Sequence, residues 1–343
     1  VSPREMVIFS RLLATLLEVQ VPLIESLTIL SGQTKNKYFQ EILTAVIHDI
    51  QDGSLLSEAL SKHRNVFSPL YVAMVQSGEV SGSLQDSLNF MAKFLEEQYE
   101  LNSKIKGALM YPAFVMGIFA VIAIGVVYFV LPGLIEILDG LNATELPITT
   151  RMIIWLNEFV QNYIWAILIA IVVLVGSVYY YVKTESGKKF WDKWQLRIPI
   201  FGDLFMKIYI ARFSINMYTL LRGGIPILTA LKISSSVVGN DVYAKVIHQA
   251  IKEIKEGSQM SSAFLKSKDF PEVAAQIIRI GEKTGKIDNV LRTLSNFYRK
   301  EVDVVVKNLT TLIEPVMIVV LGLGVGVFVV SILMPIYNIA GSI

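Results

Sequence analysis

The spacing of apolar residues predicts helices along most of the first hundred residues. Between residues 5 and 106, apolar residues recur at helical intervals, without the sustained alternation typical of a strand. Three other segments, residues 107–135, 159–182 and 315–343, contain no Asp, Glu, Lys, Arg or His. Each is longer than the roughly 20 apolar residues that cross a bilayer. We therefore expect membrane spans near residues 113–131, 162–182 and 316–334.

The segment before the first span is expected to form a bundle of six helices. Pro22 is suited to the first turn of the second helix, because its ring presets the helical φ angle. Ser68 is suited to capping the fifth helix, which we expect to stop at Gly78. The sixth helix is expected to begin after Gly82 and to lead into the first span.

The same pattern occurs twice in the chain. Gly78-Glu79-Val80-Ser81-Gly82 returns 203 residues later as Gly281-Glu282-Lys283-Thr284-Gly285. In each copy a proline, Pro112 or Pro315, follows the first glycine by 34 residues and opens an uncharged segment. Pro22 is matched by Pro226 at an offset of 204. Such self-similarity at a fixed offset indicates one helical module used twice.

The composition and the distribution of charge indicate a membrane protein. The 343 residues are 53% hydrophobic and only 17% charged, with a mean hydropathy of +0.54. Nine Lys and Arg precede Pro112 and 21 lie between Lys183 and Pro315, whereas residues 132–161 contain one, Arg151. Because basic loops stay on the cytoplasmic side, we expect both repeats in the cytoplasm and the middle loop outside.

The predicted fold class is an all-α membrane protein with two homologous six-helix cytoplasmic bundles and three transmembrane helices. The expected divisions are a first cytoplasmic domain at 1–111, a first transmembrane helix at 112–132, a periplasmic loop at 133–161, a second transmembrane helix at 162–182, a basic and aromatic linker at 183–208, a second cytoplasmic domain at 209–314, a third transmembrane helix at 315–335 and a periplasmic tail at 336–343.

The linker at 183–208 mixes cations with large aromatic residues. Its Lys188, Lys189, Phe190, Trp191 and Trp194 are typical of a helix that lies on an anionic lipid surface. A solvated helix with a few core aromatics remains an equal alternative. The chain has no cysteine, which excludes disulfides and thiolate chemistry.

No catalytic, cofactor-binding or metal-binding residue is predicted. The segment from Gly281 to Lys286 superficially resembles a phosphate-binding loop, but three residues separate its glycines where that loop needs four, and Ile287 follows the lysine. The histidines, His48, His63 and His248, do not correspond between the repeats and lack metal-ligand spacing.

The candidate sites are structural or partner-binding motifs. We expect Gly78 and Gly281 to end one helix, and Gly82 and Gly285 to let the next begin close by. Glu79 and Glu282 either cap or pair within that joint, or present a carboxylate to a partner. Within the third span, Gly322 and Gly326 form a G-x-x-x-G motif, which favours helix association but also occurs by chance in Gly-rich apolar sequence.

Taken together, these motifs resemble those of a known family. The two helical repeats, the repeated Gly-Glu-x-x-Gly and the segments Ile198-Pro199-Ile200-Phe201-Gly202 and Ala211-Arg212-Phe213 are similar to the inner-membrane platform protein of type IV pilus and type II secretion machines. The resemblance covers essentially the whole chain. It implies a non-enzymatic protein of the bacterial, or archaeal-like, cell inner membrane that forms homo-oligomers.

The resemblance also implies partners. These are the cytoplasmic hexameric secretion or pilus assembly ATPase, pilins or pseudopilins, other inner-membrane assembly proteins and membrane lipids, with no nucleic acid and no cofactor. Two features depart from the family, since Val19-Gln20 stands where the second repeat has Gly223-Gly224, and the N-terminal segment of most members is absent. A small oligomeric transporter for a lipid or solute is the alternative, although its spans would need polar residues that are missing here.

Overall fold

The computed structural model describes residues 1–125, 180–199 and 201–340, and isolated positions or short groups between residues 126 and 178. Every regular element in these ranges is helical, which confirms the predicted all-α class. The predicted loop at 133–161, most of the second span and the end of the first lie largely outside the described residues. Among the residues described, no helix has both the length and the hydropathy needed to cross a membrane.

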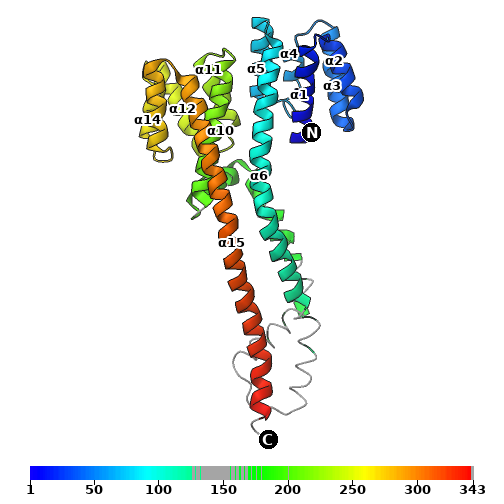
Figure 1. Cartoon of the computed structure of the whole chain (residues 1–343), viewed down its shortest axis with the longest axis vertical. Helices are drawn as coiled ribbons and strands as arrows, with labels where there is room; N and C mark the ends of the chain where they lie inside the picture. Colours follow the sequence, from blue (N-terminus) through cyan, green and yellow to red (C-terminus); the bar gives the residue numbers. More distant parts are fainter. Residues whose placement is uncertain are drawn as a thin grey trace. The chain divides into compact units, whose positions relative to one another are not determined.

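The chain divides into two compact units. Unit 1 contains Val1–Lys104 and Lys189–Val305, and unit 2 contains Ile105–Lys188 and Val306–Ile343. The short helices of both sequence repeats lie in unit 1, where Figure 1 shows them as two groups. The contacts between the repeats are therefore contacts within one unit.

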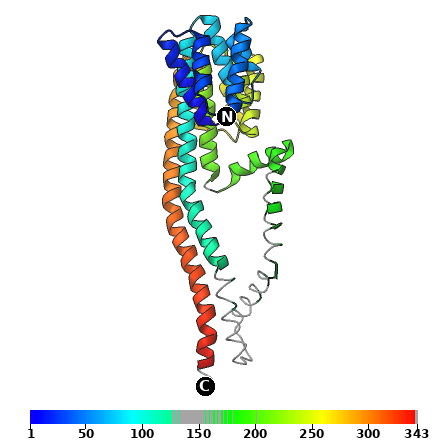
Figure 2. The ribbon, with the colours of Figure 1, turned by 90° about the vertical axis from the view of Figure 1, so that its right-hand side faces the viewer.

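The two repeats contain the same succession of helices. Repeat 1 consists of α1 (Pro3–Glu18), α2 (Leu23–Gln33), α3 (Lys37–Gln51), α4 (Leu56–Ser61), α5 (Pro69–Ser81) and the first part of α6 (Leu84–Gly125). Repeat 2 consists of α10 (Phe201–Arg222), α11 (Ile227–Val237), α12 (Asp241–Lys255), α13 (Met260–Lys266), α14 (Glu272–Thr284) and the first part of α15 (Ile287–Ala340). Within unit 1, α6 and α15 run side by side (Figure 2).

Two helices extend beyond the limits expected from sequence. α10 begins at Phe201 rather than at 209, so part of the predicted linker at 183–208 forms the first turns of the second repeat. The rest of that linker forms α9 (Glu185–Trp194) and the short 3-10 helix η2 (Gln195–Arg197). α15 continues to Ala340, into the predicted tail at 336–343.

Each repeat has a core centred on aromatic rings. In repeat 1, Phe9 packs edge-on against Phe39, with the ring centres 5.3 Å apart, and Phe67 lies against both. In repeat 2, Phe213 packs edge-on against Phe264, also with the centres 5.3 Å apart. These rings are almost completely buried. Edge-to-face packing of this kind stabilises a core beyond the burial of apolar area alone.

Candidate functional site: the glycine and glutamate joints

The repeated Gly-Glu-x-x-Gly segment forms the joint between the fifth and sixth helices of each repeat. Its second glycine is left-handed, with a φ of 68° at Gly82 and 66° at Gly285. The amide of Ser83 donates to the carbonyl of Gly78 at 2.8 Å, and that of Lys286 donates to Gly281 at 3.0 Å. This is the Schellman geometry, in which a left-handed glycine ends a helix and satisfies its last carbonyls.

The prediction that Gly78 and Gly281 end the fifth helices is therefore wrong. Both glycines lie inside their helices, which continue to Ser81 and Thr284. Their role is to allow close approach. A Cβ atom at Gly78 would lie 2.9 Å from the Cα of Leu84, on the next helix, and one at Gly281 would lie 3.2 Å from the Cα of Ile287. The first glycine is thus needed for packing, and the second for chain reversal.

The two glutamates cap a helix from elsewhere in their own repeat. The carboxylate of Glu79 accepts hydrogen bonds from the amides of Leu56 at 2.6 Å and Ser57 at 3.1 Å, at the start of α4. The carboxylate of Glu282 accepts from Met260 at 2.7 Å and Ser261 at 2.9 Å, at the start of α13.

This arrangement suits the capped helices, because neither α4 nor α13 has a capping side chain of its own. A carboxylate there satisfies free amides and is favoured by the helix dipole. Each joint thus holds three helices of its repeat together. Both carboxylate oxygens of each glutamate are engaged in these bonds.

The predicted proline sites have different surroundings. Pro22 and Pro226 stand at the N-cap positions of α2 and α11, with φ angles of −55° in both, so each directly precedes the first helical turn. Pro112 and Pro315 lie inside α6 and α15, and the helices continue through both. No new helix starts at either of these two prolines.

Gly322 and Gly326 lie in the second half of α15. A Cβ atom at either position would meet no other atom within 4 Å among the residues described. This face of α15 is therefore unoccupied in the described part of the chain. Their role in helix association remains a prediction.

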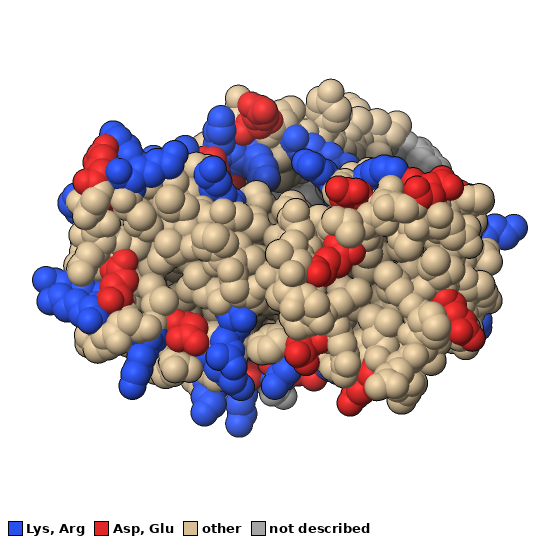
Figure 3. All heavy atoms as spheres, turned by 90° about the horizontal axis from the view of Figure 1, so that it is seen from above, with Lys and Arg blue, Asp and Glu red and all other residues tan. Residues whose placement is uncertain are grey.

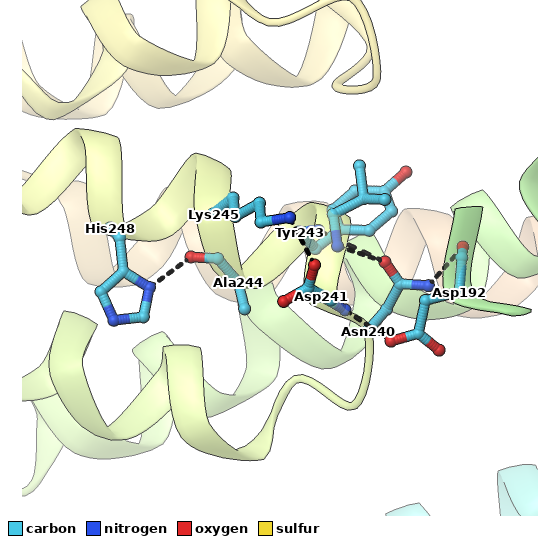
Figure 4. Close-up of polar contacts among 8 residues, drawn as sticks. Asp192, Asn240, Asp241, Tyr243, Ala244, Lys245 and His248 are labelled. Atoms are coloured by element: carbon cyan, nitrogen blue, oxygen red, sulfur yellow. Dashed lines mark hydrogen bonds and ion pairs between the residues drawn. The ribbon is translucent and has the colours of Figure 1, made fainter. Parts of the chain in front are cut away.

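A buried polar cluster, which the sequence did not reveal, attaches α9 to repeat 2 (Figure 4). The Asn240 side chain donates to the carbonyl of Asp192 at 2.9 Å, and the Asp192 carboxylate accepts from the amide of Asp241 at 2.7 Å. Asn240 also caps α12, by accepting from Val242 at 2.9 Å. Asn240 and Asp192 are 3% and 5% exposed, so both are satisfied in the interior.

The capping role of Asn240 could have been predicted from the sequence. Asn36 caps α3 by accepting from Phe39 at 3.3 Å, and it lies 204 residues before Asn240. The repeat offset could therefore have identified both caps. The partner Asp192 lies outside the repeated segment, so the comparison of repeats could not have found it.

The ion pairs that join the repeats lie between α6 and α15. Arg299 donates to the carboxylate of Glu97 and, at 2.9 Å, to its backbone carbonyl. Lys104 contacts Asp303 at 3.1 Å. Nearby, a cavity of about 270 Å³ is lined by residues that include Phe90, Tyr218 and Arg292. The guanidinium carbon of Arg292 lies 5.5 Å from the Tyr218 ring centre, so this cation is held against an aromatic face.

The shifted pKa values have structural causes. Burial raises the pKa of Tyr71 to about 12, although its hydroxyl accepts a bond from Ser10 at 3.2 Å. Burial also lowers the pKa of Arg212 and raises that of Tyr209. Neither a group of three metal-ligating side chains nor a serine hydrogen-bonded to a histidine occurs in the described ranges. The glycines, glutamates and polar side chains described above serve the packing and the capping of helices.

These features define a class of protein: an all-helical chain of two tandem repeats, whose repeated motifs hold helices together. The family described as type II secretion system (T2SS), protein F, matches the chain at residues 9–132 and again at residues 213–335. The chain belongs to this family. The double match also confirms the internal repeat, because the matched segments begin 204 residues apart and end 203 apart.

Curated relatives come from pilus and secretion systems alike. The chain is 38% identical over 345 residues to a "Type IV pilus assembly protein PilC" of Thermus thermophilus, covering 99% of this chain and 84% of the relative. It is 35% identical to the protein of that name in Myxococcus xanthus, covering 100% and 82%. It is 28% identical to a "Type II secretion system protein F" of Xanthomonas campestris pv. campestris, covering 98% and 82%.

Proposed function

We propose that this chain is the inner-membrane platform of a type IV pilus or type II secretion machine. The observation that carries the proposal is the double family match, supported by relatives whose names assign them to pilus assembly and type II secretion. In this role the chain binds a cytoplasmic hexameric ATPase and couples ATP hydrolysis to the assembly or disassembly of pilins or pseudopilins. Other inner-membrane assembly proteins complete the machine.

The proposed topology has three membrane spans and places both repeats in the cytoplasm. The uncharged segments and the excess of Lys and Arg in the second repeat support it. In unit 1, Phe190 is 62% exposed and Trp194 is 48% exposed on α9, next to Lys189 and Lys193. Exposed aromatics beside cations suit contact with anionic lipid headgroups.

The proposed role is that of a scaffold and not of an enzyme. The repeated glycines and glutamates hold helices in place, and the shifted pKa values belong to groups that are buried, ion-paired or, like Glu5, hydrogen-bonded at a helix N-terminus. Mechanical work must then come from a partner, and the two repeats offer it two related surfaces.

Labelling of single cysteines tests the topology, because these 343 residues contain no cysteine. Cysteines at Ser54 and Ser258 are expected to react only with a membrane-permeant reagent, and one at Asn142 also with an impermeant one. Any other pattern contradicts two cytoplasmic repeats.

Binding to the host's ATPase tests the partner. The detergent-purified chain, immobilised on an affinity resin, is expected to retain the ATPase. An unrelated, folded membrane protein on the same resin is the control and is expected to retain none. Failure of the folded chain to retain the ATPase contradicts the proposed coupling.

A further inference from the structure

The contact between the repeats uses one surface from each. We define the edge surface by three positions on the fifth helix, Leu70, Met74 and Ser77 in repeat 1 and Val273, Ile277 and Ile280 in repeat 2. We define the turn surface by three positions around the first interhelical turn, Val19, Gln20 and Ile24 in repeat 1 and Gly223, Gly224 and Leu228 in repeat 2. The members of each set correspond at the repeat offsets of 203 and 204.

Within the chain, the edge surface of repeat 1 lies against the turn surface of repeat 2. The hydroxyl of Ser77 donates a hydrogen bond to the carbonyl of Gly223. The approach is close enough that a Cβ atom at Gly223 would lie 2.5 Å from the sulfur of Met74. Met74 is accordingly only 1% exposed.

This contact leaves the other two surfaces without a partner among the residues described. On the edge surface of repeat 2, Val273 is 66% exposed and Ile280 is 59% exposed. On the turn surface of repeat 1, Val19 is 65% exposed. By contrast, Leu70, which occupies in repeat 1 the position that Val273 occupies in repeat 2, is only 2% exposed.

The unpaired surfaces are also the more apolar ones at the point of contact. Where the in-chain contact has Ser77 and Gly223, the corresponding positions of the unpaired surfaces carry the apolar side chains of Ile280 and Val19. Residues 273, 277 and 280 have the spacing of a single helix face, which gives α14 a stripe of branched apolar side chains. Val273 and Ile280 are exposed, and Ile277 between them is half-buried against the core. Neighbouring exposed apolar side chains of this kind favour a protein contact.

Charges around the two unpaired surfaces are complementary. Arg279 and Lys283 flank the stripe on α14 around Ile280, and one acidic side chain, Glu272, lies at its start beside Val273. Glu18 and Glu25 flank the turn of repeat 1, and Arg279, Lys283, Glu18 and Glu25 are all exposed. At the positions that correspond to these four, the in-chain contact has Gln76, Val80, Arg222 and Thr229. The opposed charges are therefore specific to the unpaired surfaces.

The same asymmetry holds for the whole repeats. In unit 1, residues 1–104 of repeat 1 contain 8 Lys and Arg against 12 Asp and Glu, and residues 201–305 of repeat 2 contain 15 against 10. Seen from above in Figure 3, Lys and Arg gather mainly on the left, the side of α12 and α14 in Figure 1. Repeat 2 of one chain and repeat 1 of another thus attract each other.

We propose that a second copy of this chain covers these surfaces, with the edge surface of repeat 2 in one copy against the turn surface of repeat 1 in the next. The in-chain contact is the template, because it joins the homologous pair of surfaces. A partner must offer an edge or a turn surface with matching charges, and another copy of the chain carries both. The contact is heterologous, so it assembles copies head to tail into a ring or an open row.

Cysteine cross-linking of the full chain in detergent tests this arrangement. Val19→Cys and Ile280→Cys are purified separately, mixed, and treated with a short bis-maleimide. The mixture is expected to give a cross-linked dimer, and each variant alone only monomer, because a heterologous contact never brings a residue next to its own copy. In the control, Ile280→Cys is mixed with Thr44→Cys, because Thr44 is exposed on α3 and lies outside both surfaces. This mixture is expected to give no cross-linked dimer.

Two results would overturn the proposal. Equal cross-linking of either single variant with itself would show a symmetric contact, and absence of the mixed dimer at a concentration where the chain is oligomeric would show that other surfaces join the copies. Both variants are first checked for native circular dichroism.

A charge exchange provides an independent test. Replacing Arg279 and Lys283 by glutamate is expected to reduce the mixed cross-link at least tenfold. Replacing Glu18 and Glu25 by lysine in the other member of the mixture is expected to restore it. A loss that the second change does not rescue would contradict the proposed pairing, because damage to one fold cannot be repaired from another chain.

Discussion

The capping of α4 by Glu79 leads to a quantitative prediction. Replacing Glu79 by alanine removes two hydrogen bonds to a charged acceptor and leaves the amides of Leu56 and Ser57 without it. Hydrogen bonds to charged groups contribute about 1.5–3 kcal/mol each, but loss of a helix cap typically costs about 0.5–2 kcal/mol, because water reaches the freed amides. Glu79 is partly exposed, so the lower scale applies. We expect Glu79→Ala to lower the free energy of unfolding by about 2 kcal/mol.

The assay is a urea titration of the full chain in detergent, followed by circular dichroism. Glu79→Gln keeps one acceptor oxygen and is expected to lose about 1 kcal/mol. Glu41→Ala, an exposed glutamate on α3, is the matched control and is expected to change stability by less than about 0.5 kcal/mol. If Glu79→Ala were as stable as this control, the capping argument would be refuted.

The same reasoning bears on the two alternatives left open for these glutamates by the sequence. If the carboxylates served only a partner, their charge could be reversed without unfolding the protein. Because both oxygens of Glu79 and of Glu282 receive backbone amides, lysine at either position is expected to destabilise its repeat. Assembly defects of such variants must therefore be compared at equal folded concentration.

Three further predictions concern other positions. Gly78→Ala is expected to lower the free energy of unfolding by about 2–3 kcal/mol. Gly281→Ala is expected to lower it by less, because the atoms around Gly281 are more distant. Urea titration measures both losses, and equal losses would contradict the packing argument. Gln20→Gly is expected to raise the melting temperature by relieving about 1 kcal/mol at a left-handed φ of 65°, and no rise would contradict it. The hydrogen bond from Arg11 lowers the pKa of Glu96, so their pairing stabilises the fold above pH 4.5 and this stability is lost as the pH falls below it; Glu96→Gln is expected to flatten the pH dependence of unfolding in that range, and an unchanged pH profile would rule out this role.

The sequence was sufficient for those features that depend on local chemistry or on self-similarity. The repeat offset and the helical class follow from self-similarity and periodicity. Pro22 marks the start of α2 but lies at its N-cap, one position before the first turn in which we expected it. The assignment of the terminating glycine was wrong because Gly78 and Gly82 are chemically identical. Only the φ angle and the close neighbours of each show that one reverses the chain and the other permits packing.

Long-range features could not be predicted from spacing. Glu79 caps a helix 22 and 23 residues earlier by binding backbone amides, and backbone donors leave no signature in residue types. The contact of Ser77 with Gly223 joins residues 146 apart, so it depends on how the two repeats pack. Such contacts are decided by tertiary structure, which is why the edge and turn surfaces became visible only in the folded chain.

The most direct test of the platform role is the ATP turnover of the host's secretion ATPase, titrated with the full chain in detergent or nanodiscs. The account predicts a saturable change in turnover at a fixed stoichiometry, with no turnover by the chain alone. Constant turnover across the titration, with the chain folded by circular dichroism, would contradict the claim that this protein couples ATP hydrolysis to the movement of pilin subunits.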